Sequence, residues 1–206
     1  ECKLGVIACN TATAAALETV RDEGRVPIIG VIRPGAAAAI SATSRRAVGV
    51  LATRLTVRSG AYVRAIRDLD PFVDVLQQPA PKLVPLIEAG GARSEEAREA
   101  VSEYVTPMLS EGAVVAPGVD TLLLGCTHYP LVRWAIEEIG GPGVRVVDSA
   151  TTTALAVREV LDSHGLRAPA GAPAHQVFAT GEARRFRDIA RTMFREDVTV
   201  DEAVLA

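Results

Sequence analysis

VIACNTATAAALETV, residues 6–20, contains an apolar run that reaches Cys9, two polar residues after it, and the start of a helix-like segment. LLLGCTHYPLVRWAIEEI, residues 122–139, repeats that order around Cys126. We expect each cysteine to lie where a buried strand ends and a helix begins. The unpaired N–H groups and positive dipole end of such a helix would lower the thiol pKa and favour the thiolate.

Apolar runs of strand length recur along the chain. They span residues 4–8, 27–32, 47–52, 121–124, 144–147 and 176–179. Their Val, Ile and Leu residues do not alternate with polar ones, which is typical of parallel strands buried on both faces. Helical patterns lie between them, including an apolar stripe over residues 97–108 that follows Ser94, an N-cap candidate. This order predicts an α/β fold of two similar three-layer domains with mainly parallel sheets and an active site in the cleft between them.

The two cysteines are too far apart in sequence to share one strand–helix unit, so we place them in different sheets. We expect a first domain formed by residues 1–34 and 148–206, with a second domain, residues 35–147, inserted into it. The chain starts with Glu-Cys-Lys and enters an apolar run at once. We therefore expect the amino-terminal part of the first domain to be missing.

Composition narrows the function classes. Hydrophobic residues make up 49% and charged residues 23% of the 206 residues, as in ordinary soluble proteins. The net charge of −3 comes from mixed signs without a basic run, which argues against nucleic acid as a partner. No apolar stretch approaches the roughly 20 residues that cross a bilayer, and no signal peptide opens the chain. We therefore expect no membrane association and a cytoplasmic location. Three cysteines are too few for a disulfide framework, which favours reduced thiols.

Two thiols that face one another across a cleft suit racemisation. One thiolate would remove a proton from a carbon atom while the opposing thiol delivers a proton to the other face. Racemisation with pyridoxal phosphate needs a Schiff-base lysine, and neither lysine of the chain, Lys3 or Lys82, follows a glycine-rich phosphate loop. The sequence therefore favours a mechanism without a cofactor. It indicates no metal site, because Cys126 and His128 form a single short pair without nearby partners.

Two other functions fit the same residues. In a cysteine-dependent hydrolase or acyl transferase, Cys126 would be the nucleophile and His128 its base. Residues two apart point in different directions on a strand or a helix, which weakens this pairing, and it leaves Cys9 without a role. In a non-catalytic binding protein, the cleft would hold an acidic metabolite.

Seven short motifs are spread over nearly the whole chain: ACNTA (8–12), GVI-x-PG (30–35), VGVLATRLTVRSGAY (48–62), LVPLIEAG (83–90), LLGCTHYPLV (123–132), VDSA (147–150) and FATGE (178–182). Together they resemble the glutamate racemases of the aspartate/glutamate racemase superfamily. The resemblance implies cofactor-independent interconversion of L- and D-glutamate, an isomerase reaction that supplies D-glutamate for peptidoglycan. It also suggests a homodimer.

The same resemblance implies roles for individual residues. Cys9 and Cys126 match the paired catalytic thiols, His128 matches a histidine that assists its neighbouring thiol, and Glu88 matches an acidic residue close to that histidine. The residues that match positions holding the substrate's carboxylate and amino groups are Asn10, Thr11, Thr127 and His128. Thr53 and Thr56 match threonines near the substrate carboxylate.

The chain also departs from the family pattern. The Asp-Ser-Gly signature and the Pro-Tyr-Gly substrate loop of the family are absent. The aspartate of that signature assists the first thiol, so Cys9 lacks its expected carboxylate partner. We therefore expect weak or no activity from these 206 residues alone.

Overall fold

The apolar runs near residues 50 and 122 form the two central strands of a parallel sheet. In the computed structural model, which describes residues 2–109, 118–169, 171, 175–194 and 197–204, these strands are β3 (Ala47–Ala52) and β5 (Thr121–Gly125). Every residue of both strands is buried. Strands β4 (Asp74–Pro79) and β6 (Arg145–Asp148) flank them in the order β4-β3-β5-β6, with all pairings parallel.

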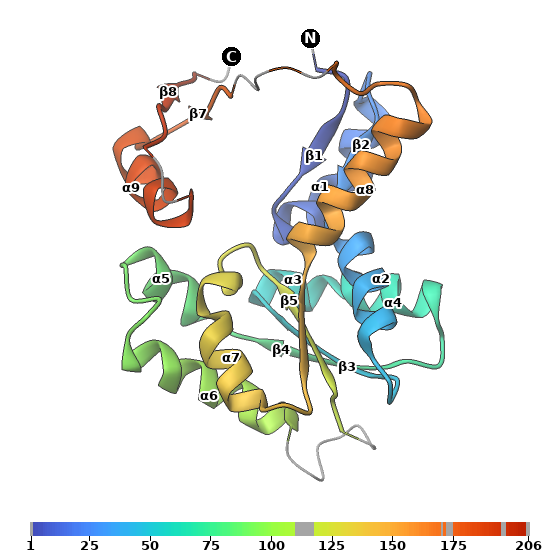
Figure 1. The fold of residues 1–206 in the computed structure, drawn as a ribbon, viewed down its shortest axis with the longest axis vertical. Helices are drawn as coiled ribbons and strands as arrows, with labels where there is room; N and C mark the ends of the chain where they lie inside the picture. The colour runs from blue at the N-terminus through green and yellow to red at the C-terminus, as the bar shows by residue number, and fades with distance from the viewer. Residues whose placement is uncertain (1, 110–117, 170, 172–174, 195–196, 205–206) are drawn as a thin grey trace. The chain divides into compact units, whose positions relative to one another are not determined.

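Helices cover both faces of this sheet (Figure 1). On one face, Leu51, Leu122 and Leu124 share a hydrophobic cluster with residues of α5 (Leu83–Glu88), α6 (Glu95–Leu109) and α7 (Arg133–Gly140). On the other face, Val48, Val50 and Leu123 share a cluster with residues of α2 (Ile32–Ala42) and α4 (Ala61–Leu69). Burial on both faces explains why the strands are continuously apolar. The predicted three-layer α/β arrangement is confirmed for this sheet.

A second parallel sheet pairs β1 (Gly5–Ile7) with β2 (Ile28–Gly30). Helix α1 (Asn10–Glu23) connects the two strands and packs on both of them. Helix α8 (Ser149–Ser163) contacts β2 and also packs along α2, so it joins the two sheets. Figure 1 shows α1 and α8 beside β1 and β2.

The chain divides into two units, residues 1–166 and residues 167–206. Both sheets described above belong to the first unit. The second unit holds a short parallel pair, β7 (Phe178–Ala179) and β8 (Asp201–Glu202), and helix α9 (Ala183–Phe194). The expected domain boundaries near residues 34 and 148 fall inside the first unit, where they stay a prediction.

Three features differ from the sequence-based expectations. Strand β4 was not expected, because Gln77, Gln78 and Pro79 interrupt its apolar pattern; such a sequence is tolerated at a sheet edge. Ile32 begins α2 instead of ending a strand, and Pro34 lies in the first turn of that helix, where proline is tolerated. The segment after Cys126 forms a 3₁₀ helix, η1 (Tyr129–Val132), before α7 begins.

No helix in the described part of the chain combines the length and the apolar character that crossing a membrane requires.

Candidate active site

The candidate side chains of the first unit gather at the carboxyl ends of β1, β3 and β5. From β3 the chain passes to β4 on one side, while β5 pairs with β3 on the other side. Connections that leave in opposite directions open a crevice at the strand ends, where α/β proteins bind ligands. A pocket of about 130 Å³ lies there. Its lining residues are Cys9, Asn10, Thr11, Thr53, Val84, Cys126, Thr127 and His128.

Cys9 is the N-cap of α1. Its backbone is extended (φ −87°, ψ 127°), and its carbonyl accepts the first helical hydrogen bond from Thr13 N–H at 2.8 Å. No side chain caps this end of the helix, and the thiol is exposed. The expected strand-to-helix position of Cys9 is confirmed. The first N–H groups of α1 are therefore free of a side-chain cap and suited to an anion.

Cys126 follows β5 directly and is buried, with 7% of its surface exposed. Burial raises the pKa of the Cys126 thiol, and the backbone N–H groups of His128 and Tyr129 only partly oppose it. The expectation of a lowered pKa was therefore wrong for this cysteine. The physical reason is that the chain after Cys126 forms a turn and a short 3₁₀ helix rather than an α-helix, and desolvation outweighs the backbone N–H groups there.

Negative charges near Cys126 act on its pKa in the same direction as burial. The Cys9 thiolate and the Glu88 carboxylate both raise the Cys126 pKa, because like charges disfavour one another. When Cys9 carries a negative charge, the thiol form of Cys126 is therefore favoured over its thiolate. That is the protonation state that a one-acid, one-base reaction requires.

His128 connects Cys126 to Glu88. The Cys126 Sγ lies 3.8 Å from His128 Nδ1, and the opposite ring nitrogen, Nε2, lies 3.1 Å from Glu88 Oε1. A carboxylate accepts, so the Nε2 proton points to Glu88 and a neutral ring presents Nδ1 as an acceptor to the thiol. We expected residues 126 and 128 to point in different directions. That expectation was wrong because they lie in the turn between β5 and η1 and not in a strand or helix.

Three threonine hydroxyls form a closed triangle beside Cys9. Thr11 Oγ1 lies 2.9 Å from Thr53 Oγ1 and 3.0 Å from Thr56 Oγ1, and the last two atoms are 3.0 Å apart. Thr53 also caps α3 (Arg54–Ser59) by accepting from the Thr56 N–H. Thr11 and Thr53 line the pocket, whereas Thr56 is fully buried and is connected to the pocket through the hydroxyls of these two residues.

Asn10 lies in the first turn of α1 and is 1% exposed. Its Oδ1 accepts a 2.5 Å hydrogen bond from the hydroxyl of Tyr62 on α4. Its Nδ2 has no hydrogen-bond partner among the residues that the structure describes. Sequence reasoning did not single out Tyr62 or the pocket residue Val84. Both lie within the quoted motifs, but nothing in the sequence shows that either approaches the cysteines.

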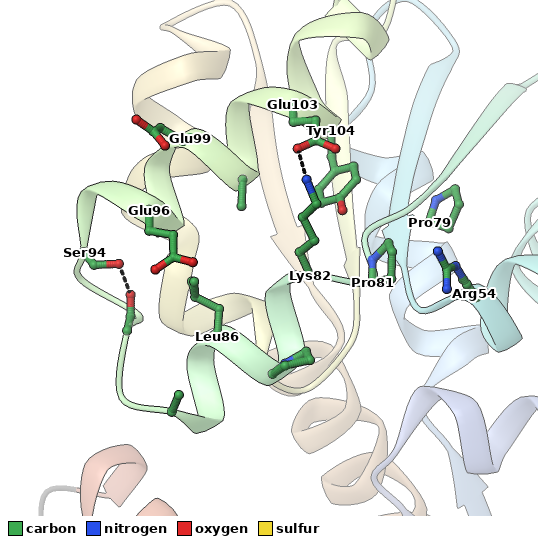
Figure 2. Close-up of a pocket in the computed structure, with 14 residues that line it drawn as sticks. Arg54, Pro79, Pro81, Lys82, Leu86, Ser94, Glu96, Glu99, Glu103 and Tyr104 are labelled. Atoms are coloured by element: carbon green, nitrogen blue, oxygen red, sulfur yellow. Dashed lines mark hydrogen bonds and ion pairs between the residues drawn. The ribbon is translucent and has the colours of Figure 1, made fainter.

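A larger groove, of about 1140 Å³, lies between α5 and α6 (Figure 2). Neither a cysteine nor a histidine is among its lining residues. Lys82 in this groove bonds to Glu103 at 2.5 Å, and this hydrogen bond raises the Lys82 pKa. A Schiff-base lysine needs the opposite shift. Among the described residues, no three Cys, His, Asp or Glu side chains are grouped as a metal site.

Comparison with known proteins places this geometry in context. The sequence model of the Asp/Glu/Hydantoin racemase family matches residues 1–157. The glutamate racemase of Listeria innocua is 42% identical over 205 residues, which cover 98% of this chain and 75% of that protein.

Solved structures agree with that match. The glutamate racemase isoform RacE1 of Bacillus anthracis superposes with a TM-score of 0.92 at 34% identity, over 98% of this chain and 74% of that one. The glutamate racemase of Francisella tularensis, solved in complex with D-glutamate, superposes with a TM-score of 0.86 at 25% identity, over 99% of this chain and 73% of that one.

Proposed function

This chain belongs to the Asp/Glu/hydantoin racemase family, and we propose that it interconverts L-glutamate and D-glutamate without a cofactor. The observation that carries the proposal is the pocket in which two thiols, Cys9 and Cys126, share a lining with hydroxyl and amide groups. The Listeria innocua relative and the superposed structures bear the name glutamate racemase, which supports glutamate as the substrate.

In the proposed reaction, one cysteine thiolate removes the proton from the substrate Cα and the other cysteine thiol donates a proton to the opposite face. The C–H bonding electrons pass into the neighbouring carboxylate, so charge develops on its oxygens. Each turnover leaves the two cysteines with exchanged protonation, and the reverse reaction restores them. The influence of the Cys9 thiolate on the Cys126 pKa supports such a one-thiolate state.

Donors at the start of α1 are suited to that developing charge. The hydroxyls of Thr11 and Thr53, the Asn10 amide and the first N–H groups of α1 all lie at one end of the pocket. Donors fixed in advance toward a developing oxyanion are the strongest means by which enzymes lower such barriers. We assign these groups to the substrate α-carboxylate, and Thr127 to the remaining polar groups of the substrate.

His128 and Glu88 are assigned to Cys126. A buried thiol with a raised pKa needs a base to become a thiolate near neutral pH. The Nδ1 of His128 lies within reach of that thiol, and Glu88 orients the ring from its other side. This arrangement is unequal, because His128 contacts Cys126 and, within the described residues, does not hydrogen-bond to Cys9.

A second function is favoured by one observation. Hydrogen bonds link Cys126 to His128 and His128 to Glu88. Cysteine hydrolases and acyl transferases link a nucleophile, a base and an orienting carboxylate in the same order. In that reaction a thioester would form on Cys126, and Cys9 would be dispensable.

The experiment follows deuterium and optical rotation together. The protein is incubated with L-glutamate in deuterated water; we expect deuterium at Cα and loss of optical rotation. Cys9→Ser and Cys126→Ser should each lower racemisation by at least about 10³-fold, while Cys2→Ser, which alters an exposed thiol, should leave it unchanged.

Other outcomes separate the alternatives. A thioester on Cys126 after incubation with an activated ester, without Cα exchange, would support the hydrolase. Binding of glutamate without Cα exchange would support a binding protein.

The cellular role follows from the reaction. D-glutamate is the product that peptidoglycan synthesis consumes, and reduced thiols fit a cytoplasmic location. A homodimer is part of the proposal through the family resemblance only, and light scattering of the purified protein tests it.

A further inference from the structure

The amide of Asn10 has a fixed polarity in this structure. Its Oδ1 accepts from the Tyr62 hydroxyl at 2.5 Å, and its Nδ2 has no partner among the described residues although the side chain is almost fully buried. A buried donor without a partner is costly, and a ligand that supplies an acceptor removes the cost. Asn10 lines the pocket between the two thiols. An acceptor bound there would therefore complete the hydrogen bonding of this amide.

The polarity depends on which group donates to Asn10. An asparagine amide that turned by 180° would present Oδ1 in place of Nδ2. In the structure the Tyr62 hydroxyl donates to Oδ1, and it stays protonated because burial raises the Tyr62 pKa and a hydrogen bond with Ser149 only partly opposes this. While this O–H points to Asn10, a turned amide would place two donors against each other.

The tyrosine ring is itself held firmly. Tyr62 is fully buried on α4. It is the last residue of the motif at residues 48–62, and no other role is assigned to it. A Cβ atom added at Gly35 on α2 would come within 3.3 Å of the Tyr62 hydroxyl oxygen. One added at Gly125, the residue before Cys126, would come within 2.9 Å of the ring. The lack of a side chain at these two glycines thus makes room for the ring, which packs closely against both of them.

We infer that Tyr62 is a positioning residue that fixes the Asn10 amide so that Nδ2 donates to the α-carboxylate of the substrate. The inference rests on the proposed function, since it takes glutamate as the ligand. Tyr62 does not line the pocket; it acts through Asn10. The bond joins α4 to the first turn of α1, so the side chain that binds substrate is set by a residue 52 positions further along the chain.

Tyr62→Phe removes the hydroxyl and keeps the ring. We expect the KM for glutamate and the Kd for D-glutamate, measured by calorimetry, to rise about tenfold, the equivalent of roughly 1.4 kcal/mol. The kcat should fall as well, because charge develops on this carboxylate during the reaction and a contact that strengthens in the transition state affects kcat. Tyr104→Phe makes the same change in a buried tyrosine of α6 outside the pocket and should leave both constants unchanged.

A double-mutant cycle tests whether Tyr62 acts through Asn10. Asn10→Ala should weaken D-glutamate binding, and adding Tyr62→Phe to that variant should have no further effect. Equal effects of Tyr62→Phe in both backgrounds, or unchanged binding in the single variant, would overturn the inference.

Asn10→Asp provides a test that leaves Tyr62 intact. Tyr62 would donate to one carboxylate oxygen, and the other oxygen would face the substrate anion. We therefore expect Asn10→Asp to bind D-glutamate more weakly than Asn10→Ala, and equal or stronger binding would contradict the inference. The proposed function fails separately, if the unaltered protein neither binds nor racemises glutamate.

Discussion

Cys126 and Cys9 occupy similar places in sequence but different environments. Cys9 is exposed at the N-terminus of α1, whereas Cys126 is buried and in contact with His128. The matching sequences therefore conceal an unequal pair. Burial raises the pKa of Cys126, and of these two thiols only Cys126 contacts a histidine among the described residues.

The raised pKa predicts how Cys126 reacts with an alkylating reagent. A thiolate is the reactive form, so a higher pKa moves the rise in reaction rate to higher pH. We expect the rate at Cys126, followed with iodoacetamide and peptide mass spectrometry, to rise at a higher pH in the folded protein than in the urea-unfolded protein. If the midpoint of the rate against pH were at or below that of the unfolded protein, the backbone N–H groups after Cys126 would outweigh burial.

Asp120 connects two elements, the end of α2 and the start of β5. Its carboxylate accepts from the Thr43 hydroxyl at 2.5 Å, from the Ser44 N–H and hydroxyl at 2.8 and 2.9 Å, and from the Arg45 N–H at 2.9 Å. Burial raises the Asp120 pKa, but these hydrogen bonds outweigh it and lower the pKa to about 2. The loop that leads into β3 is thereby tied to the start of β5, the neighbouring strand that precedes Cys126.

This anchor predicts a pH dependence of stability. Asp120 has a lower pKa in the folded than in the unfolded state, so its contribution is complete above about pH 4 and is lost as the pH falls toward 2. The contribution is about 2 kcal/mol. Asp120→Asn should lower the free energy of unfolding by about that amount at pH 7 and flatten its decline between pH 4 and 2.

Urea titrations at several pH values measure this. Asp74→Asn, which alters an exposed carboxylate on β4, is the matched control and should behave as the unaltered protein. If the free energy of unfolding of Asp120→Asn declined between pH 4 and 2 as steeply as that of the unaltered protein, other carboxyl groups would dominate the loss of stability in acid.

At the scale of the whole molecule, the pocket draws its residues from β1–α1, β3–α3, α5 and β5–η1. A ligand that contacts all of them stabilises the folded first unit as a whole. At 100 times its Kd, a ligand adds about 2.7 kcal/mol. For a chain of this size that is a rise in Tm of about 5 to 10 °C.

We expect D-glutamate to produce such a rise, and Cys126→Ser to retain most of it while losing racemisation. Binding would then be separated from catalysis, because the serine keeps the shape of the pocket and the groups that donate to the substrate carboxylate are intact. Differential scanning calorimetry with D-glutamate, and with glutarate as a control that lacks the amino group, measures the shift. Loss of the shift in Cys126→Ser alone would mean that the thiol binds substrate rather than transferring its proton.

Much of the architecture could be read from local patterns. The strand-length runs at residues 47–52 and 121–124, the helix capped by Ser94 and the position of Cys9 agree with the structure. These features depend on neighbours in sequence, where side-chain periodicity and capping act. The edge strand β4 was not predicted, because its polar residues give no local indication that it pairs with another strand.

The sequence by itself indicated the candidate site residues and determined which strand ends present the two thiols, because a thiol after a buried apolar run has few other places to lie. Only the tertiary structure decided how those residues act on one another. It joined Glu88 to His128 across 40 residues, set the Tyr62 hydroxyl against Asn10, and buried Cys126 enough to raise its pKa. Hydrogen bonds and desolvation depend on distances between segments that are remote in sequence, and those distances exist only after the sheet and its helices have packed.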